Sequence, residues 1–207
     1  MRRADKLAAK SDVAERVLAK AEVGYLGLIT TSGRPRVIPV DFAVDSGVVY
    51  FHGALTGEKY DALVTSPPVC FSVSIAYSVI PSHWLADENA RGANHYYESV
   101  QIDGRGSVVT DRSQKAAALQ LLMEKYQPEG GFRPISAEDP FYRKVIEETA
   151  VFRIDAERME TKVNMGQNHS ERVQREVVDR LEERGTVTDR LTAALIEEML
   201  DEPDPAR

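Results

Sequence analysis

The chain has 207 residues, 43% of them hydrophobic and 29% charged, and a formal charge of −7. This length suits one globular domain with an appendage, and the acidic balance argues against broad nucleic-acid binding, which needs a basic surface. The only cysteine, Cys70, excludes an intrachain disulfide and is expected to be a buried, unreactive thiol. No apolar run approaches the roughly 20 residues of a membrane span, so we expect a cytoplasmic protein without a membrane partner.

The first elements in chain order are a helix and three strands. Ser11 and Asp12 precede apolar residues at helical spacing and predict a capped amphipathic helix of about three turns. The pattern then changes to β-forming runs separated by glycine-containing turns. These runs predict a three-stranded meander over 24–30, 36–44 and 48–52.

The middle of the chain alternates further strands with inserted helices. We expect strands over 69–76, 96–109 and 149–154, and helices over 60–64, 111–126 and 140–148. The long polar connection over 77–95 is typical of a functional or flexible loop. Strands that come first, with helices inserted late, favour a closed or nearly closed antiparallel barrel over a parallel βαβ sheet.

The last quarter is helical and charged. Ser170 is expected to cap a helix that ends at Gly185, and Asp189 to cap a second one. Both helices are amphipathic and lack a core of their own, so we expect them to pack on the barrel or on a second subunit, followed by a disordered tail over 201–207. The expected domains are an N-terminal helix over 1–22, a barrel over 23–165 and a helical extension over 166–207.

The strongest local signal of a site is the turn over 51–59. A strand ends there in small residues and a helix opens near Lys59, which leaves backbone N–H groups and a lysine suited to a phosphate. Taken alone, a glycine-rich turn is more often only a turn. The sequence shows no nucleophile elbow, Walker A motif or dinucleotide fingerprint, and its four histidines lie far apart, so we expect no metal site.

With these strands and this turn, the chain resembles the pyridoxamine 5′-phosphate oxidase-like FMN-binding split barrels over about 24–162, and more closely their nitroimidazole-resistance and flavin-nucleotide-binding branch. In that family, a strand like 36–40 lies along the flavin, and the next strand ends in a turn with a basic residue, as 51–59 does here. The resemblance implies a mainly antiparallel split β-barrel with added helices. It also implies a homodimer that holds FMN at its interface.

The resemblance also implies roles for particular residues. Arg36, Lys59 and Lys162 would meet the phosphate, Ser99 would approach the flavin from the partner subunit, and His52 would lie near the isoalloxazine ring as a proton donor or substrate contact. The implied cofactor-binding set is Arg36, Val37, Ile38, Pro39, Val40, Phe51, His52, Gly53, Ala54, Gly57, Lys59, Ser99 and Lys162. Glu58 and Glu98 replace customary arginines, and this loss of positive charge would weaken FMN binding.

Each assignment has a structural alternative. His52 could bond a neighbouring carbonyl, Arg36 could face solvent, and Trp84, Tyr96 and Tyr97 could form core or dimer contacts instead of a wall for the ring. The expected function is an FMN-dependent oxidoreductase acting on a small organic molecule. The alternatives are a non-catalytic protein that binds flavin, haem or deazaflavin in a regulatory or storage role, and a barrel whose phosphate pocket has decayed.

Overall fold

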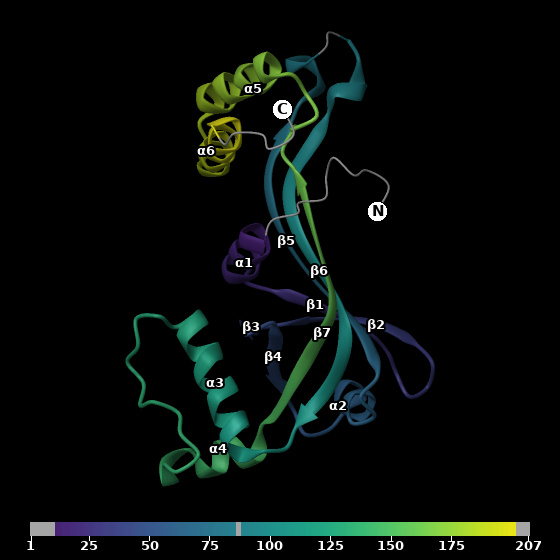
Figure 1. Cartoon of the computed structure of the whole chain (residues 1–207), viewed down its shortest axis with the longest axis vertical. Helices are drawn as coiled ribbons and strands as arrows, with labels where there is room; N and C mark the ends of the chain where they lie inside the picture. Colours follow the sequence, from purple (N-terminus) through teal and green to yellow (C-terminus); the bar gives the residue numbers. More distant parts are fainter. Residues whose placement is uncertain (1–10, 86–87, 202–207) are drawn as a thin grey trace. The chain divides into compact units, whose positions relative to one another are not determined.

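A computed structural model describes residues 11–85 and 88–201 (Figure 1). In these ranges seven strands form one mainly antiparallel sheet in the order β2-β1-β5-β6-β7-β4-β3. The strands are β1 Gly24–Ile29, β2 Pro35–Val40, β3 Phe42–Asp45, β4 Val48–Gly53, β5 Pro68–Ile80, β6 Asn94–Val109 and β7 Ala150–Asn164. The split-barrel prediction is confirmed, but the sheet is open: β2 and β3 are its edge strands rather than neighbours that close it.

Six α-helices accompany the strands within the described ranges, together with short 3₁₀ turns. They are α1 Ser11–Lys20, α2 Glu58–Leu63, α3 Arg112–Tyr126, α4 Arg143–Glu148, α5 Glu171–Arg184 and α6 Val187–Asp201. None of the described helices is long and apolar enough to cross a membrane. Part of the expected 1–22 segment, and the expected tail apart from Asp201, lie outside the described residues.

The contacts divide the chain into two compact units. Among described residues, the first comprises 74–99 and 161–201, and the second comprises 11–73 and 100–160. Strands β5, β6 and β7 supply residues to both. The two units are therefore described one at a time.

The expected strand over 36–44 is two strands with Asp41 between them. β2 pairs with β1, whereas β3 pairs with β4, so the three runs do not form a meander. The backbone at Phe42 is bonded to a side chain: its N–H donates to the Tyr126 hydroxyl oxygen at 2.9 Å, and its carbonyl accepts from that hydroxyl at 3.2 Å. This long-range contact holds the chain where it leaves one strand partner for another, and local β-propensity does not reveal it.

The three long strands, β5, β6 and β7, extend beyond the ranges that the sequence predicted. β5 continues to Ile80 and β6 begins at Asn94, so the polar connection is shorter than expected and contains two 3₁₀ turns. These turns are η2 Ser82–Trp84 and η3 Ala90–Gly92; a third, η4 Pro140–Tyr142, precedes α4. β7 runs through an exposed stretch, 155–159, that shows no alternation of apolar and polar residues. Residues there are strand because of pairing rather than burial.

The second unit is built around aromatic rings. Phe42 meets Phe71 edge to face at 5.0 Å, and Phe51 stacks on Phe152 at 5.2 Å. Helix α3 lies against β3 and β4 (Figure 1), where Leu119 and Leu122 join Ala43 and Val151 in one buried cluster. This packing gives β3 and β4 a rigid support.

Some of the helix-terminus signals are confirmed, whereas Ser170 precedes α5 without a side-chain capping hydrogen bond. The Asp111 carboxylate accepts from the Gln114 N–H at 2.8 Å and starts α3, and Gly185 ends α5 with a left-handed φ of 67°. The prediction that Asp189 caps a helix is wrong. Thr186 precedes α6 instead, and Asp189 bonds back to it as the third residue of that helix.

Candidate functional site

The β4–α2 turn brings the Lys59 side chain to the backbone of His52. The Lys59 Nζ donates to the His52 carbonyl oxygen at 3.3 Å and lies 5.6 and 5.3 Å from the ring centroids of Phe51 and Phe152. Burial lowers the pKa of Lys59. A Cβ on Gly53 would lie only 2.7 Å from this Nζ, so the glycine leaves room for the ammonium group.

His52 and Lys59 line the same pocket, with a volume of about 290 Å³. Its other lining residues are Val23, Pro39, Val40 and Asp41. The His52 side chain is exposed, whereas Phe51 before it is buried in the core. Phe51 therefore offers a ligand its backbone rather than its ring.

Arg36 and Glu58 form a bidentate ion pair. The Arg36 Nε donates to Glu58 Oε2 at 2.9 Å, and its Nη2 donates to Oε1 at 3.3 Å. These hydrogen bonds hold the pKa of Glu58 below its usual range, so the carboxylate is charged at neutral pH. Arg36 lines a different pocket from Lys59. Glu58 is paired with Arg36, and Lys59 is the next residue in the chain.

The pocket that Arg36 lines has a volume of about 490 Å³ and continues an apolar sheet face. On β1 and β2 the side chains of Tyr25, Ile29 and Val37 are 47, 56 and 72% exposed, and register pairs Tyr25 with Pro39 and Ile29 with Pro35. Val37 and Pro39 share this face, whereas Ile38 and Val40 point the other way with Arg36. Ala54 and Gly57 are exposed in the turn before α2.

Cys70 also lines this pocket. The prediction of a buried thiol is wrong, because Cys70 is partly exposed. Burial and a hydrogen bond with Asp103 raise its pKa. The thiol form is therefore favoured, in keeping with an unreactive cysteine.

Ser99 and Lys162 belong to the first unit. Ser99 is half-buried on β6, and the Lys162 Nζ lies 5.1 Å from the ring centroid of Tyr97. The neighbouring Glu98 is only 2% exposed and accepts a hydrogen bond from the Tyr77 hydroxyl at 2.8 Å. Its carboxylate is thus engaged within the sheet of its own unit.

The aromatic residues weighed as a flavin wall have other roles in that unit. Tyr96 is 1% exposed, and its burial raises its pKa to about 12. The Arg184 guanidinium lies 4.7 Å from the Trp84 ring centroid. Tyr96 is a core residue, and Trp84 contacts the C-terminal helices.

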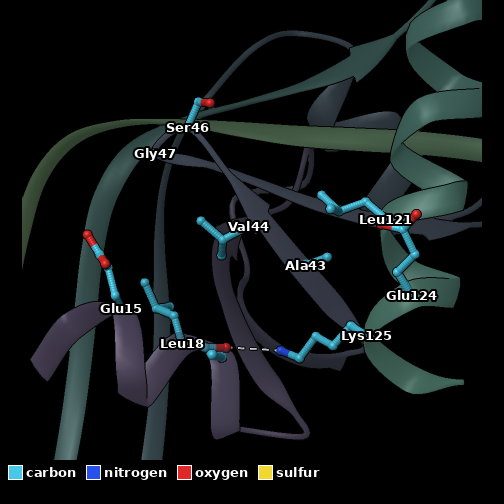
Figure 2. A pocket seen from close by; sticks show the side chains of 10 residues that line it. Glu15, Leu18, Ala43, Val44, Ser46, Gly47, Leu121, Glu124 and Lys125 are labelled. Carbon is cyan, nitrogen blue, oxygen red and sulfur yellow. Dashed lines mark hydrogen bonds between the residues drawn. The ribbon is translucent and has the colours of Figure 1, made fainter. Parts of the chain in front are cut away.

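Sequence reasoning missed a larger pocket of about 620 Å³, lined by α1, β3 and α3 in the second unit (Figure 2). Lys125 reaches across it: its Nζ donates to the Leu18 carbonyl at 3.0 Å and lies 3.5 Å from the Phe42 ring centroid. Burial lowers the pKa of Lys125 to about 8. A lysine in the last turn of a helix is common, so nothing in the sequence indicated that Lys125 lines a pocket.

The fold and the β4–α2 turn agree with a known protein family. A family model described as pyridoxamine 5′-phosphate oxidase matches residues 10–163, and the chain belongs to that family. The resemblance drawn from the sequence is therefore confirmed. No curated protein matches the chain at a significant level.

Solved structures add similar folds. A proposed 5-nitroimidazole antibiotic resistance protein from Bacteroides thetaiotaomicron has a TM-score of 0.63 and 20% identity, covering 76% of this chain and 86% of its own. A flavocytochrome from Azotobacter vinelandii has a TM-score of 0.66 and 24% identity, covering 80% and 72%. A FAD- and haem-binding protein from Mycobacterium smegmatis has a TM-score of 0.66 and 17% identity, covering 78% and 74%. At these identities the likeness establishes the fold alone.

Proposed function

We propose that this chain forms a homodimer that binds FMN and acts as a flavin-dependent oxidoreductase on a small organic molecule. The observation that carries the proposal is the pocket shared by His52 and Lys59. The resemblance to the family implies a contact of His52 with the flavin ring and of Lys59 with the phosphate. Because α2 has only six residues, the proposal relies on side-chain charges rather than on a helix dipole.

The charges near this turn suit a phosphorylated flavin. Lys59 on α2 lies in the pocket with His52, where Gly53 leaves space for its ammonium group. Arg36 on β2 lines a separate pocket, so a bound phosphate would have to reach both cations. The apolar face with Tyr25, Ile29 and Val37 suits a planar ring or a second subunit. Relatives of similar fold include a flavocytochrome and a FAD- and haem-binding protein, which supports a flavin as the cofactor class.

In this proposal Arg36 and Lys59 hold the phosphate, and the backbone of 37–40, 51–54 and Gly57 lies along the cofactor. Bound FMN would supply the electron or hydride transfer. His52, exposed beside the phosphate lysine, would donate a proton to the substrate or contact it, since an imidazole exchanges protons near neutral pH. Ser99, contributed by the partner subunit, and Lys162 would complete the contacts.

Lys59→Ala tests the phosphate contact. A hydrogen bond to a charged group contributes about 1.5–3 kcal/mol, so we expect FMN affinity to fall at least about tenfold, measured by quenching of flavin fluorescence. Riboflavin, which lacks the phosphate, should bind equally to both proteins, and Lys59→Arg should retain most of the FMN affinity. An unchanged FMN affinity in Lys59→Ala would remove the phosphate contact from the proposal.

A second candidate is a protein that binds flavin without turnover, and the Arg36–Glu58 pair favours it because one phosphate-binding cation is already neutralised. The visible spectrum separates the two. A flavin that bleaches with NADH or NADPH and recovers with an acceptor supports the oxidoreductase. A flavin that stays bound and oxidised supports the binding protein, and a protein that takes up no flavin at micromolar FMN contradicts both.

A further inference from the structure

The Arg36–Glu58 ion pair sits at the proposed phosphate position. The two side chains are 43 and 54% exposed. Exposed ion pairs contribute little to the stability of a fold. The pair therefore matters more for what it does to a ligand than for what it does to folding.

Glu58 offers Arg36 the two-oxygen geometry that a phosphate would offer. Arginine binds carboxylates and phosphates through the same fork of parallel N–H donors. The Nε and Nη2 donors of Arg36 are engaged with Glu58, so a phosphate takes that fork only after the carboxylate leaves. The carboxylate also repels a phosphate monoester, which carries about 1.5–2 negative charges at neutral pH.

Lys59 follows Glu58 in the chain, but its positive charge is not directed at the Arg36–Glu58 pair and does not cancel the repulsion between Glu58 and a phosphate. Its ammonium group is directed to the His52 carbonyl and to the rings of Phe51 and Phe152. A phosphate would have to draw it away from those contacts. Taken together, Arg36, Glu58 and Lys59 carry one net positive charge, less than a phosphate dianion needs for neutralisation.

We propose that Glu58 is a built-in competitor for the cofactor phosphate, which holds Arg36 in the absence of phosphate and makes bound FMN exchangeable. The inference rests on the proposed FMN site. When FMN leaves, the carboxylate returns to Arg36, so the ion pair favours release. The residue thus sets how long the flavin stays, a property distinct from whether the site recognises flavin.

The test compares Glu58→Gln with the wild type, using FMN and riboflavin as probes. Removing the competing charge near an exposed arginine should tighten FMN binding about tenfold and slow its release by a similar factor. Riboflavin affinity should not change. Asp61→Asn is the matched control, since Asp61 is an exposed acid on the same helix, and it should alter FMN affinity by less than about threefold.

An Arg36→Met background separates competition from simple repulsion. There, Glu58→Gln should lose most of its effect on FMN, because the group competed for is gone. The inference is overturned if Glu58→Gln leaves FMN affinity or release unchanged, weakens FMN, or tightens riboflavin equally. It is also overturned if Asp61→Asn has the same effect. If neither flavin binds the wild type or Glu58→Gln, the proposed function itself fails, whereas FMN binding without a Glu58 effect rejects the competitor alone.

Discussion

At the scale of single residues, two lysines are held against aromatic rings. The Lys59 Nζ lies 5.3 Å from the Phe152 ring centroid, and the Lys125 Nζ lies 3.5 Å from that of Phe42. Both ammonium groups also donate to a backbone carbonyl, and burial lowers the pKa of each. Position in the sequence alone does not distinguish these lysines from solvent-facing ones.

Lys125→Met should change how stability depends on pH. In the folded chain the pKa of Lys125 is lowered to about 8, against an ordinary value of 10.5. Between these values the unfolded chain binds more protons, so this residue makes stability rise with pH by at most about 1.4 kcal/mol per unit. The free energy of unfolding of the wild type, measured with urea, should therefore rise relative to that of Lys125→Met from pH 7 to pH 9.5.

Lys144, 82% exposed on α4, provides the control Lys144→Met. Its stability difference from the wild type should stay constant over the same range. A constant difference for Lys125→Met as well would contradict the burial of its ammonium group.

At the scale of elements, one carboxylate fastens the α5–α6 hairpin to β5 within the first unit, where the two helices lie side by side (Figure 1). Asp189 is 1% exposed, and its Oδ1 accepts from Ser78 at 2.6 Å and from Arg184 at 2.5 Å. The Thr192 hydroxyl bonds to Ser78 at 2.9 Å. Because several groups donate hydrogen bonds to the carboxylate, they offset the free-energy cost of burying its charge.

Asp189→Asn should destabilise this hairpin by about 3 kcal/mol, since it leaves the Arg184 charge uncompensated. Hydrogen exchange should show the loss of protection in α5 and α6. The Arg184 hydrogen bond lowers the pKa of Asp189 from 3.8, so its contribution is present above that value and is lost as the pH falls below it. The wild-type advantage should therefore shrink below about pH 4.

Glu176→Gln is the control for this prediction. Glu176 pairs with Arg172 on the exposed face of α5 at 3.7 Å, and such a pair contributes less than about 0.5 kcal/mol. Equal losses in the two variants would indicate that the buried network does not fasten the hairpin.

At the scale of the whole molecule, the proposed homodimer needs an exposed apolar surface through which two subunits can associate. The face of β1 and β2 that carries Tyr25, Ile29 and Val37 is the candidate, since exposed apolar residues gather there on adjacent strands. It adjoins the pocket lined by Arg36. A dimer formed on this face would bring a second chain to the proposed cofactor site.

Ile29→Asp should dissociate that dimer, because it places a charge in an apolar interface. Light scattering should give about twice the 23.0 kDa chain mass for the wild type and the single mass for the variant. Val145→Asp, at a similarly exposed position on α4, should remain dimeric. Dissociation by both substitutions, or by neither, would place the interface elsewhere.

Local signals in the sequence predicted much of the fold. The Asp111 cap, the Gly185 helix end and the β-forming residues of β1 and β4 depend on neighbouring residues, so they can be interpreted without a structure. The same holds for the turn that places Lys59 beside His52. These features also sufficed to indicate the family.

Contacts between distant residues decided the rest. The break at Asp41 accompanies a Tyr126 hydroxyl 84 positions away from Phe42, and the exposed part of β7 is a strand through pairing alone. The role of Glu58 likewise emerges only when Arg36, 22 positions earlier, closes on it. Local chemistry in the sequence accounts for the helix ends, for most of the strands and for the charged side chains that they carry, because these depend on neighbouring residues. The points where strands break or extend, and the charges that meet, depend on the folded chain, because those contacts join residues far apart in the sequence.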